Sequence, residues 1–182
     1  MKKGATTLLL LALALATTAT AQIKWYKFEE AVELCKKKPK KIFIDVYTDW
    51  CGWCKVYDKN TFSNPDIAEY MNKHFYSVKF NAETHDTVRF QGHVFVNPSS
   101  GRNSTHMLAA QLLNGRMSFP SVVFLNEQFQ LLHVQSGYLP PEQFAPFMVY
   151  IGETWYEPSK NTSWEAFTKD FKWQPASRKA AN

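Results

Sequence analysis

The chain has few cysteines and lacks the two pairs of ligands that a closed zinc site needs. Each of these shortages excludes a class of protein. Only three cysteines occur in 182 residues, whereas a secreted scaffold stapled by disulfides usually carries more, in even number. The sequence contains no second Cys-x-x-Cys and no paired-histidine motif. A closed zinc site would therefore lack two of its four ligands.

Excess charge and long apolar runs are also missing. The formal net charge is +5 at pH 7, of which Lys2 and Lys3 contribute two. That excess is too small to favour nucleic acid or an anionic membrane as a partner. Beyond the first twenty residues no apolar stretch is long enough for a transmembrane helix. Hydrophobic residues (45%) and aromatic residues (15%) suffice for a packed core, which excludes wholesale disorder.

The N-terminal segment has the pattern of a secretion signal. Lys2 and Lys3 form a charged start, Leu8–Ala16 is an apolar run too short to anchor in a bilayer, and 19–21 is a small-x-small cleavage site. We therefore expect residues 1–21 to be a signal peptide. The remaining chain is expected to be exported, without stable insertion in a membrane.

The pattern of apolar residues predicts an α/β domain with no internal repeat. A nearly continuous apolar strand, a helix and a second strand follow one another from Lys41 to Asn81, which is typical of a right-handed βαβ unit with parallel strands. Two later strands are close enough to form an antiparallel hairpin at a sheet edge. Helices are expected over 23–38, 52–60, 65–74, 107–113, 141–151 and 164–171, and strands over 41–48, 75–81, 88–90, 93–96, 121–126 and 130–136.

Two cysteines separated by two residues stand in the motif Trp50-Cys51-Gly52-Trp53-Cys54-Lys55, directly after a predicted strand. Cys51 falls where the strand ends and a helix begins, so free backbone N–H groups and the helix dipole point at its sulfur and lower its pKa. The spacing places Cys54 beside Cys51 on one helix face. Cys51 can then attack a substrate disulfide, and Cys54 can release the product.

The third cysteine and one acid require separate interpretations. Cys35 falls on the apolar stripe of the first helix, which predicts a buried core residue; a resolving thiol is the alternative, which we do not adopt. Asp45 interrupts the apolar strand before the cysteine motif. It is either an edge-facing acid on a local hydrogen bond or a buried proton acceptor behind the cysteines, with a raised pKa.

Three pieces of the sequence resemble the thioredoxin-fold family. They are Phe43–Lys55 (strand, acid and Trp-Cys-x-x-Cys-Lys turn), Val78–Asn81 (strand with a lysine) and Phe119-Pro120 before an apolar strand. The resemblance covers about 24–152. Within the family, Tyr47–Cys51 together with Asn60–Pro65 is similar to an exported branch that includes the C-terminal periplasmic domain of the thiol reductase DsbD.

The resemblance implies roles for residues around the cysteine pair. Asp45 would accept the proton of Cys54, directly or through water, and Lys79 would approach Asp45 and hold its charge in check. The alternative for Lys79 is a solvent-facing strand lysine. With Cys51 as nucleophile, these four residues form the predicted catalytic set, and Cys51 and Cys54 form the redox disulfide.

The resemblance also implies a substrate-binding set. Pro120 would follow a cis peptide bond, which occurs in only about one X-Pro bond in twenty. That bond would place the backbone of Phe119 to pair with an extended substrate segment. Trp50 and Trp53 would flank the sulfur atoms as an apolar rim.

Together these inferences predict an α/β thioredoxin fold, a mixed central sheet flanked by helices. Residues 22–174 are expected to form one thioredoxin-like domain, with an insertion over about 82–118 before the cis-proline loop and a helical C-terminal extension over about 153–174. The tail 175–182 is expected to be disordered. The departures from ordinary thioredoxin are this longer segment and the Gly52-Trp53 pair, where thioredoxin has Gly-Pro.

The predicted function is an exported thiol-disulfide oxidoreductase that reduces or isomerises protein disulfides rather than introducing them. We expect no cofactor and no bound metal. Two alternatives stay open: copper or zinc handling through the cysteine pair, and a redox-inactive binding module with this fold. Haem attachment is excluded because Lys55 stands where that motif requires histidine.

The expected partners are disulfide-containing exported proteins and a membrane thiol donor, with no nucleic acid, and we expect a monomer. The bacterial periplasm is the expected location, and secretion is the alternative. Asn103 and Asn161 begin glycosylation sequons, which would be modified in a eukaryotic secretory pathway.

Overall fold

The structure is a computed structural model that describes residues 21–99, 101, 104–160 and 162–173. Nearly all of the predicted signal peptide, the tail 175–182 and the two sequon asparagines Asn103 and Asn161 lie outside these residues. Among the helices described, none is long and apolar enough to cross a membrane.

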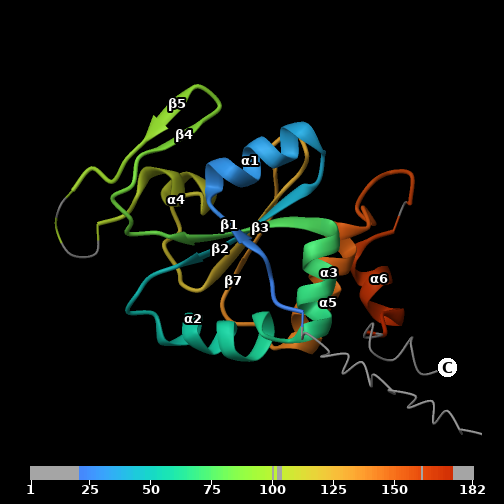
Figure 1. Cartoon of the computed structure of the whole chain (residues 1–182). Helices are drawn as coiled ribbons and strands as arrows, with labels where there is room; N and C mark the ends of the chain where they lie inside the picture. Colours follow the sequence, from blue (N-terminus) through green and yellow to red (C-terminus); the bar gives the residue numbers. More distant parts are fainter. Residues whose placement is uncertain (1–20, 100, 102–103, 161, 174–182) are drawn as a thin grey trace, which may run out of the picture.

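The centre of the molecule is a five-stranded mixed sheet with strand order β1-β3-β2-β6-β7 (Figure 1). The first three of these strands are parallel neighbours, whereas β6 runs antiparallel to both β2 and β7. This confirms the predicted mixed sheet, its parallel pair and its antiparallel hairpin. The strands are β1 (Trp25–Tyr26), β2 (Lys41–Tyr47), β3 (Phe75–Asn81), β6 (Ser121–Leu125) and β7 (Leu131–Ser136).

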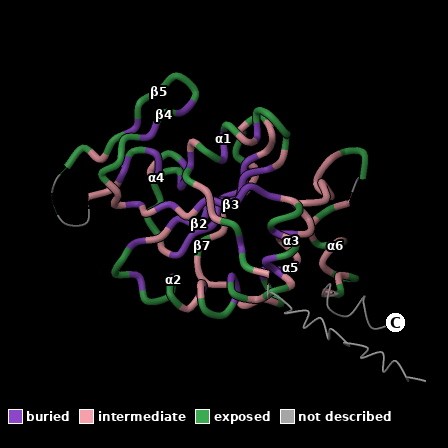
Figure 2. Tube along the Cα trace, in the orientation of Figure 1, coloured by how far each residue is buried: buried purple, intermediate pink, exposed green. Residues whose placement is uncertain are grey.

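Helices cover both faces of the sheet, and each face has its own apolar core. Successive side chains of a strand point to opposite faces, so Ile42 and Ile44 pack with α1 and α4 while Phe43 packs with α3 and α5. Figure 2 shows that the buried residues concentrate in the strands and on the helix faces toward them. The helices are α1 (Phe28–Lys37), α2 (Gly52–Tyr57), η1 (Asp58–Phe62, a π-helix), α3 (Pro65–His74), α4 (Met107–Leu112), α5 (Pro141–Gly152) and α6 (Trp164–Asp170).

The prediction that the first helix begins at residue 23 is wrong. Residues 25–26 are not helical but form β1, which pairs in parallel with Ser77 and Val78 of β3. This long-range pairing overrides the local helical pattern. Helix α1 itself begins at Phe28, and its expected apolar stripe is buried, including Cys35 at 1% exposed.

The helix of the cysteine motif also differs from its prediction. It was expected to run to about residue 60, but the α-helical turns end at Tyr57 and a π-helix continues to Phe62. The wider turns place Thr61 so that its hydroxyl donates to the Leu139 carbonyl at 2.8 Å, and they bury Phe62 against the ring of Phe43. Single π turns of this kind are frequent near functional sites.

Between β3 and β6 the chain forms a separate two-stranded sheet and α4. Strands β4 (Val88–Phe90) and β5 (His93–Phe95) pair as the predicted hairpin. Gln91 and Gly92 connect them, and both have positive φ (50° and 79°), as a two-residue hairpin turn requires. In Figure 1 this hairpin projects beyond α1 and the central sheet.

The C-terminal helices complete the second face. Ser163 caps α6 by accepting a hydrogen bond from the Ala166 amide at 3.2 Å. Trp164 of α6 stacks on Phe147 of α5, with ring centroids 4.4 Å apart. Phe147 is only half-buried, whereas Phe144 of the same helix is buried, because Phe147 lies between α6 and the outer strand β7.

The cap of α3 gives a test of local stability. The Asn64 side chain accepts hydrogen bonds from the amides of Asp66 and Ile67 at 3.0 and 3.2 Å. We predict that Asn64→Ala lowers the free energy of unfolding in urea by about 1 kcal/mol, because these amides lose their acceptor. Asn64→Asp, which keeps an acceptor, is the control. An equal loss in both variants would contradict the assigned cap.

Candidate active site

Cys51 and Cys54 form a disulfide where β2 leads into α2 (Figure 1). Cys51 has an extended backbone and is the N-cap of the helix. Its sulfur accepts a hydrogen bond from the Cys54 amide at 3.1 Å, and its own amide donates to the Thr48 carbonyl at 3.1 Å. An N–H donor aimed at a sulfur at a helix start stabilises the thiolate form after reduction.

The two cysteines are equally buried in this disulfide form, each 4% exposed. The Cys51 sulfur is bonded to Cys54 and accepts the hydrogen bond of the Cys54 amide, so it lies against the first turn of α2.

Asp45 lies in β2 and is only 1% exposed. Its Oδ2 is 3.2 Å from Nζ of Lys79, and its Oδ1 has no hydrogen-bond partner among the described residues. Burial raises the pKa of the carboxyl from 3.8 to about 6, even though the Lys79 charge opposes the change. The interpretation of Asp45 as an edge-facing acid is therefore wrong, and the buried placement is correct.

Lys79 lies opposite Asp45 in the parallel register of β2 and β3. Its ammonium also forms an ion pair with Asp58, the first residue of η1. Burial alone would lower the pKa of Lys79, but the two carboxylates together raise it above its ordinary value. Lys79 is thus an internal cation shared by two acids, not a solvent-facing strand lysine.

Asp58 was not among the site residues predicted from the sequence. It follows Cys54 by four residues, and residues at this spacing share one helix face, so the spacing was a usable signal. Its negative charge raises the pKa of Asp45, because the two like charges repel each other. The cysteine helix therefore contributes directly to the electrostatics of Asp45.

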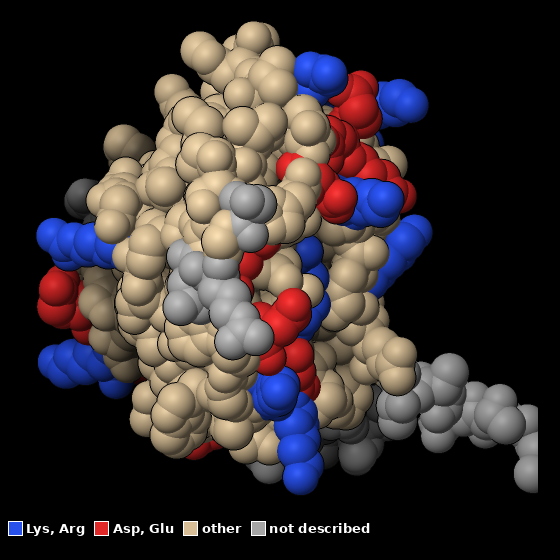
Figure 3. Space-filling view, turned by 90° about the vertical axis from the view of Figure 1, so that its left-hand side faces the viewer, with Lys and Arg blue, Asp and Glu red and all other residues tan. Residues whose placement is uncertain are grey.

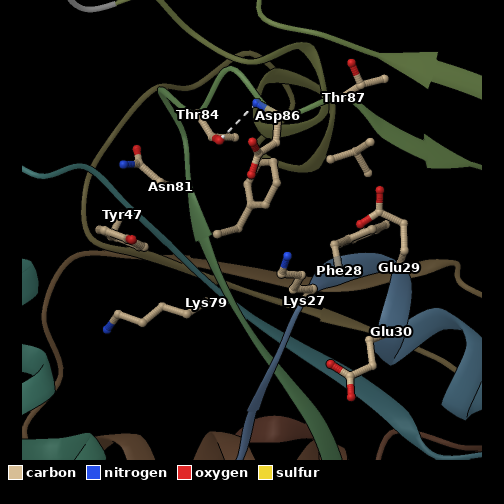
Figure 4. Close-up of a pocket in the computed structure, with 12 residues that line it drawn as sticks. Lys27, Phe28, Glu29, Glu30, Tyr47, Lys79, Asn81, Thr84, Asp86 and Thr87 are labelled. Atoms are coloured by element: carbon tan, nitrogen blue, oxygen red, sulfur yellow. Dashed lines mark hydrogen bonds between the residues drawn. The ribbon is translucent and has the colours of Figure 1, made fainter.

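A cleft of about 850 Å³ opens beside Lys79, and Figure 4 shows its lining. Lys27 and Glu29 at the start of α1 line one side, and Tyr47 and Lys79 line the other. The Lys79 ammonium points away from α1 in this view. The side chain of Lys79 keeps 25% exposure, so the cleft brings solvent close to the ion pair that holds Asp45.

Two exposed aromatic side chains are next to the disulfide in the sequence. Trp50 and Trp53 are each 61% exposed. Trp50 meets Phe119 edge-to-face, with ring centroids 6.0 Å apart, and Trp53 stacks on Tyr138 at 5.7 Å. Tyr138 was not predicted, because its contact depends on the turn after β7.

The Phe119–Pro120 peptide bond is cis. The Pro120 carbonyl accepts a hydrogen bond from the Gly137 amide at 2.8 Å, which fixes the loop to the end of β7. The contact between Trp50 and Phe119 brings this loop beside the cysteine turn. The eight predicted site residues lie in four places. Asp45 is in β2, Lys79 is in β3, and Trp53 and Cys54 are in α2. Trp50 and Cys51 lie between β2 and α2, and Phe119 and Pro120 lie directly before β6.

No cluster of three or more histidine, cysteine, aspartate or glutamate side chains suited to a metal ion occurs in the part of the chain that the structure describes.

The mixed sheet, the cysteine pair at the start of α2 and the cis-proline loop define a thioredoxin-fold protein. Solved structures agree. The chain is similar to a thioredoxin from Thermus thermophilus (TM-score 0.56, 15% identity, covering 77% of this chain and 97% of that one). It is also similar to the DsbH oxidoreductase (TM-score 0.53, 18% identity, covering 74% and 88%). At these identities the likeness concerns the fold.

The family model Thioredox_DsbH, described as "Protein of unknown function, DUF255", matches residues 12–165. The chain therefore belongs to this family. The predicted relation to thioredoxin-fold proteins of the DsbD type is confirmed.

Curated relatives include human spermatogenesis-associated protein 20 (27% identical over 147 residues, 77% of this chain and 17% of that protein). Protein B0495.5 of Caenorhabditis elegans is 31% identical over 127 residues, 68% of this chain and 15% of that protein. The thiol:disulfide interchange protein DsbD of Escherichia coli is 29% identical over 115 residues, 62% of this chain and 17% of that protein. The chain thus spans about a sixth of the length of these relatives.

The buried acid gives a test by pH. The pKa of Asp45 is about 6 in the folded protein and near 3.8 when unfolded, so folding favours the neutral carboxyl. The stabilisation is complete well below pH 3.8 and is lost as pH rises through 6, by roughly 3 kcal/mol in total. We predict that Asp45→Asn, compared with wild type by urea unfolding of the oxidised protein, gains roughly 2 kcal/mol in relative stability between pH 4 and pH 8, because part of the loss already occurs below pH 4.

Asp49→Asn, which replaces an exposed carboxylate close to the same turn, is the matched control and should not change the slope. A stability difference between Asp45→Asn and wild type that stays constant from pH 4 to pH 8 would contradict the raised pKa.

Proposed function

We propose that this protein is a thiol-disulfide oxidoreductase that reduces or isomerises disulfides in exported proteins. One observation carries the proposal: the Cys51–Cys54 disulfide stands at a helix start with the Cys54 amide donating to the Cys51 sulfur. A buried acid with a raised pKa lies in the strand that leads into this turn. Such an arrangement favours a nucleophilic thiolate and provides an acceptor for a proton.

In the proposed reaction the reduced Cys51 thiolate attacks one sulfur of a substrate disulfide. The Cys51–substrate bond forms, the substrate S–S bond breaks, and the second substrate sulfur leaves as a thiolate. Cys54 then loses its proton and attacks the Cys51 sulfur. The substrate's first sulfur leaves as a thiolate, so the substrate has gained two electrons and the Cys51–Cys54 disulfide is formed again.

Asp45 is the proposed acceptor of the Cys54 proton. A carboxyl with a pKa of about 6 is poised for proton transfer near neutral pH, and its Oδ1 has no competing hydrogen bond among the described residues. Lys79 keeps the ionised form of Asp45 available by pairing with it. Asp58 limits that effect, because it shares the same ammonium.

The exposed aromatic residues form the proposed substrate surface. Trp50 and Trp53 offer large apolar areas on either side of the disulfide, and Phe119 presents its backbone next to Pro120. Side chains that surround a disulfide in an unfolded or misfolded protein are often apolar, so this rim suits extended polypeptides.

The direction and location of the reaction rest on the relatives and on the N-terminal pattern. The relative DsbD is a thiol:disulfide interchange protein, which supports thiol-disulfide exchange. The proposed direction is reduction, with electrons from a membrane thiol donor. Residues 1–21 are proposed as a cleaved signal peptide, with residues 22–174 acting as a monomeric domain in the periplasm; secretion remains the alternative. The segment over about 82–118 is the proposed insertion of this domain.

Single cysteine variants test the proposed function. We predict that Cys51→Ser lowers the reduction of insulin by dithiothreitol to the uncatalysed rate, because the nucleophile is lost. Cys54→Ser should instead accumulate a mixed disulfide through Cys51, detectable as a mass increase under non-reducing conditions. Cys35→Ser, at a buried thiol that donates to the Lys40 carbonyl at 3.1 Å, is the control and should keep wild-type activity.

Activity that persists in Cys51→Ser would refute the proposed mechanism. Wild-type protein that never accelerates insulin reduction would instead favour the redox-inactive binding module.

A further inference from the structure

A chain of hydrogen bonds connects the segment over about 82–118, called the insertion below, to the active-site rim. The indole Nε1 of Trp50 donates to Oε1 of Glu83 at 3.0 Å. Glu83 lies two residues beyond β3, and its own amide donates to the Asn81 side chain at 2.9 Å. The residue that precedes the nucleophile is therefore held by the first turn of the insertion.

Asn97 continues the connection from the other end of the hairpin. Its side-chain Nδ2 donates to the Glu83 carbonyl at 3.3 Å and to the Ser104 carbonyl at 2.9 Å. The side-chain amide of Asn97 thus connects Ser104 to the turn that carries Glu83. A single side chain joins three separate segments at this point.

The backbone around this junction is fixed by further hydrogen bonds. The Ala82 amide donates to the Tyr47 carbonyl at 2.8 Å, and the His106 amide donates to the Ala82 carbonyl at 2.7 Å. Met107 donates to the Val96 carbonyl at 3.0 Å. The insertion therefore leaves and returns at the same turn, directly beside the end of β2.

Apart from its hydrogen bond to Glu83, the side chain of Trp50 is weakly held. Its side chain is 61% exposed, and its one described ring contact is the edge-to-face contact with Phe119. A net hydrogen bond contributes about 1 kcal/mol, which is about a five-fold change in population. The orientation of the indole is thus sensitive to where Glu83 lies.

The face of the molecule on the left-hand side of Figure 1 carries few charges over much of its area. Figure 3 shows it as a broad area of uncharged residues, with acidic and basic side chains in separate groups at the upper right, at the left edge and in the lower middle. Val94, Val96 and Met107 of the insertion are exposed. A bound chain that reaches Trp50 would lie close to these segments.

We propose that Asn97 is a positioning residue that acts through Glu83 to fix the indole of Trp50 beside the disulfide, so that the insertion sets how tightly a polypeptide substrate is held. A small disulfide needs no such contact. The proposal rests on the proposed function and names polypeptides, rather than small disulfides, as the substrates whose binding depends on Asn97.

The sharpest variant is Asn97→Asp. It keeps the size of the side chain and the oxygen that accepts from the Ser99 amide at 3.4 Å, but it removes both N–H donors. Asn126→Asp is the matched control. Asn126 also closes a turn, with Nδ2 donating to Gln130 at 2.8 Å, but it lies between β6 and β7, at the end of the sheet far from Pro120.

Two substrates separate binding from chemistry. We expect Asn97→Asp to raise KM for insulin about five-fold with little change in kcat, because one hydrogen bond of the rim is lost. Exchange with the small disulfide 5,5′-dithiobis(2-nitrobenzoate) should keep its wild-type rate. Asn126→Asp should resemble wild type with both substrates.

A double-mutant cycle tests whether the effect passes through the indole. Trp50→Phe removes the Nε1–H donor, so adding Asn97→Asp to Trp50→Phe should raise KM no further. Glu83→Gln keeps an acceptor for the indole and should preserve the wild-type KM. An equal penalty from Asn97→Asp with and without Trp50, or an equal loss with both substrates, would overturn the proposal.

The NMR signal of the Trp50 indole gives a test that does not depend on enzyme activity. In the oxidised protein the indole N–H resonance of Trp50 is identified by its loss in Trp50→Phe. It should shift in Asn97→Asp and stay in place in Asn126→Asp, and an unchanged resonance in Asn97→Asp would overturn the proposal. If wild-type protein reduces neither substrate, the proposed function itself fails, which is a distinct result.

Discussion

The ion pair between Lys79 and the buried carboxylate of Asp45 is the contact on which the rest of the site depends. It joins β2 to β3 in the middle of the sheet, and the second ion pair of Lys79 reaches Asp58, at the end of the cysteine helix. Two strands and the cysteine helix are therefore connected at one cation. A buried carboxylate without such a partner would be strongly destabilising, so this pairing is what allows an acid to lie in the strand that leads into the Cys51–Cys54 turn.

The same burial sets the protonation equilibrium of Asp45. Two opposing effects set the pKa of Asp45. Loss of solvent favours its neutral form, whereas Lys79 favours its ionised form. The resulting pKa of about 6 lies close to neutral pH. A buried carboxyl of this kind destabilises the fold near neutral pH, which is common at active sites. The rim is built differently. Trp50 and Trp53 are exposed, and their positions depend on contacts with Phe119, Tyr138 and Glu83 rather than on the core.

Much of this arrangement could be predicted from the sequence, since it depends on short motifs. The strand, the cysteine pair and the apolar stripe of α1 are local patterns, and the resemblance supplied the approach of Lys79 to Asp45 and the cis bond before Pro120. The missed features depend on long-range contacts. Strand β1 has only two residues and no periodicity, so only its pairing with β3 defines it. Glu83 and Asn97 became visible only when folding brought their segments together, although the spacing of Asp58 from Cys54 was a signal that could have been used.

The central claim is that Cys51 and Cys54 form a working redox pair that gives electrons to substrates. Its most direct test is the reduction potential of this pair, measured by equilibrating the protein with defined mixtures of reduced and oxidised glutathione and counting free thiols by alkylation and mass. The account predicts a potential more negative than about −200 mV, in the range of reducing proteins with this fold. A potential near about −120 mV, typical of a strongly oxidising pair, would contradict it and would make the protein a donor of disulfides.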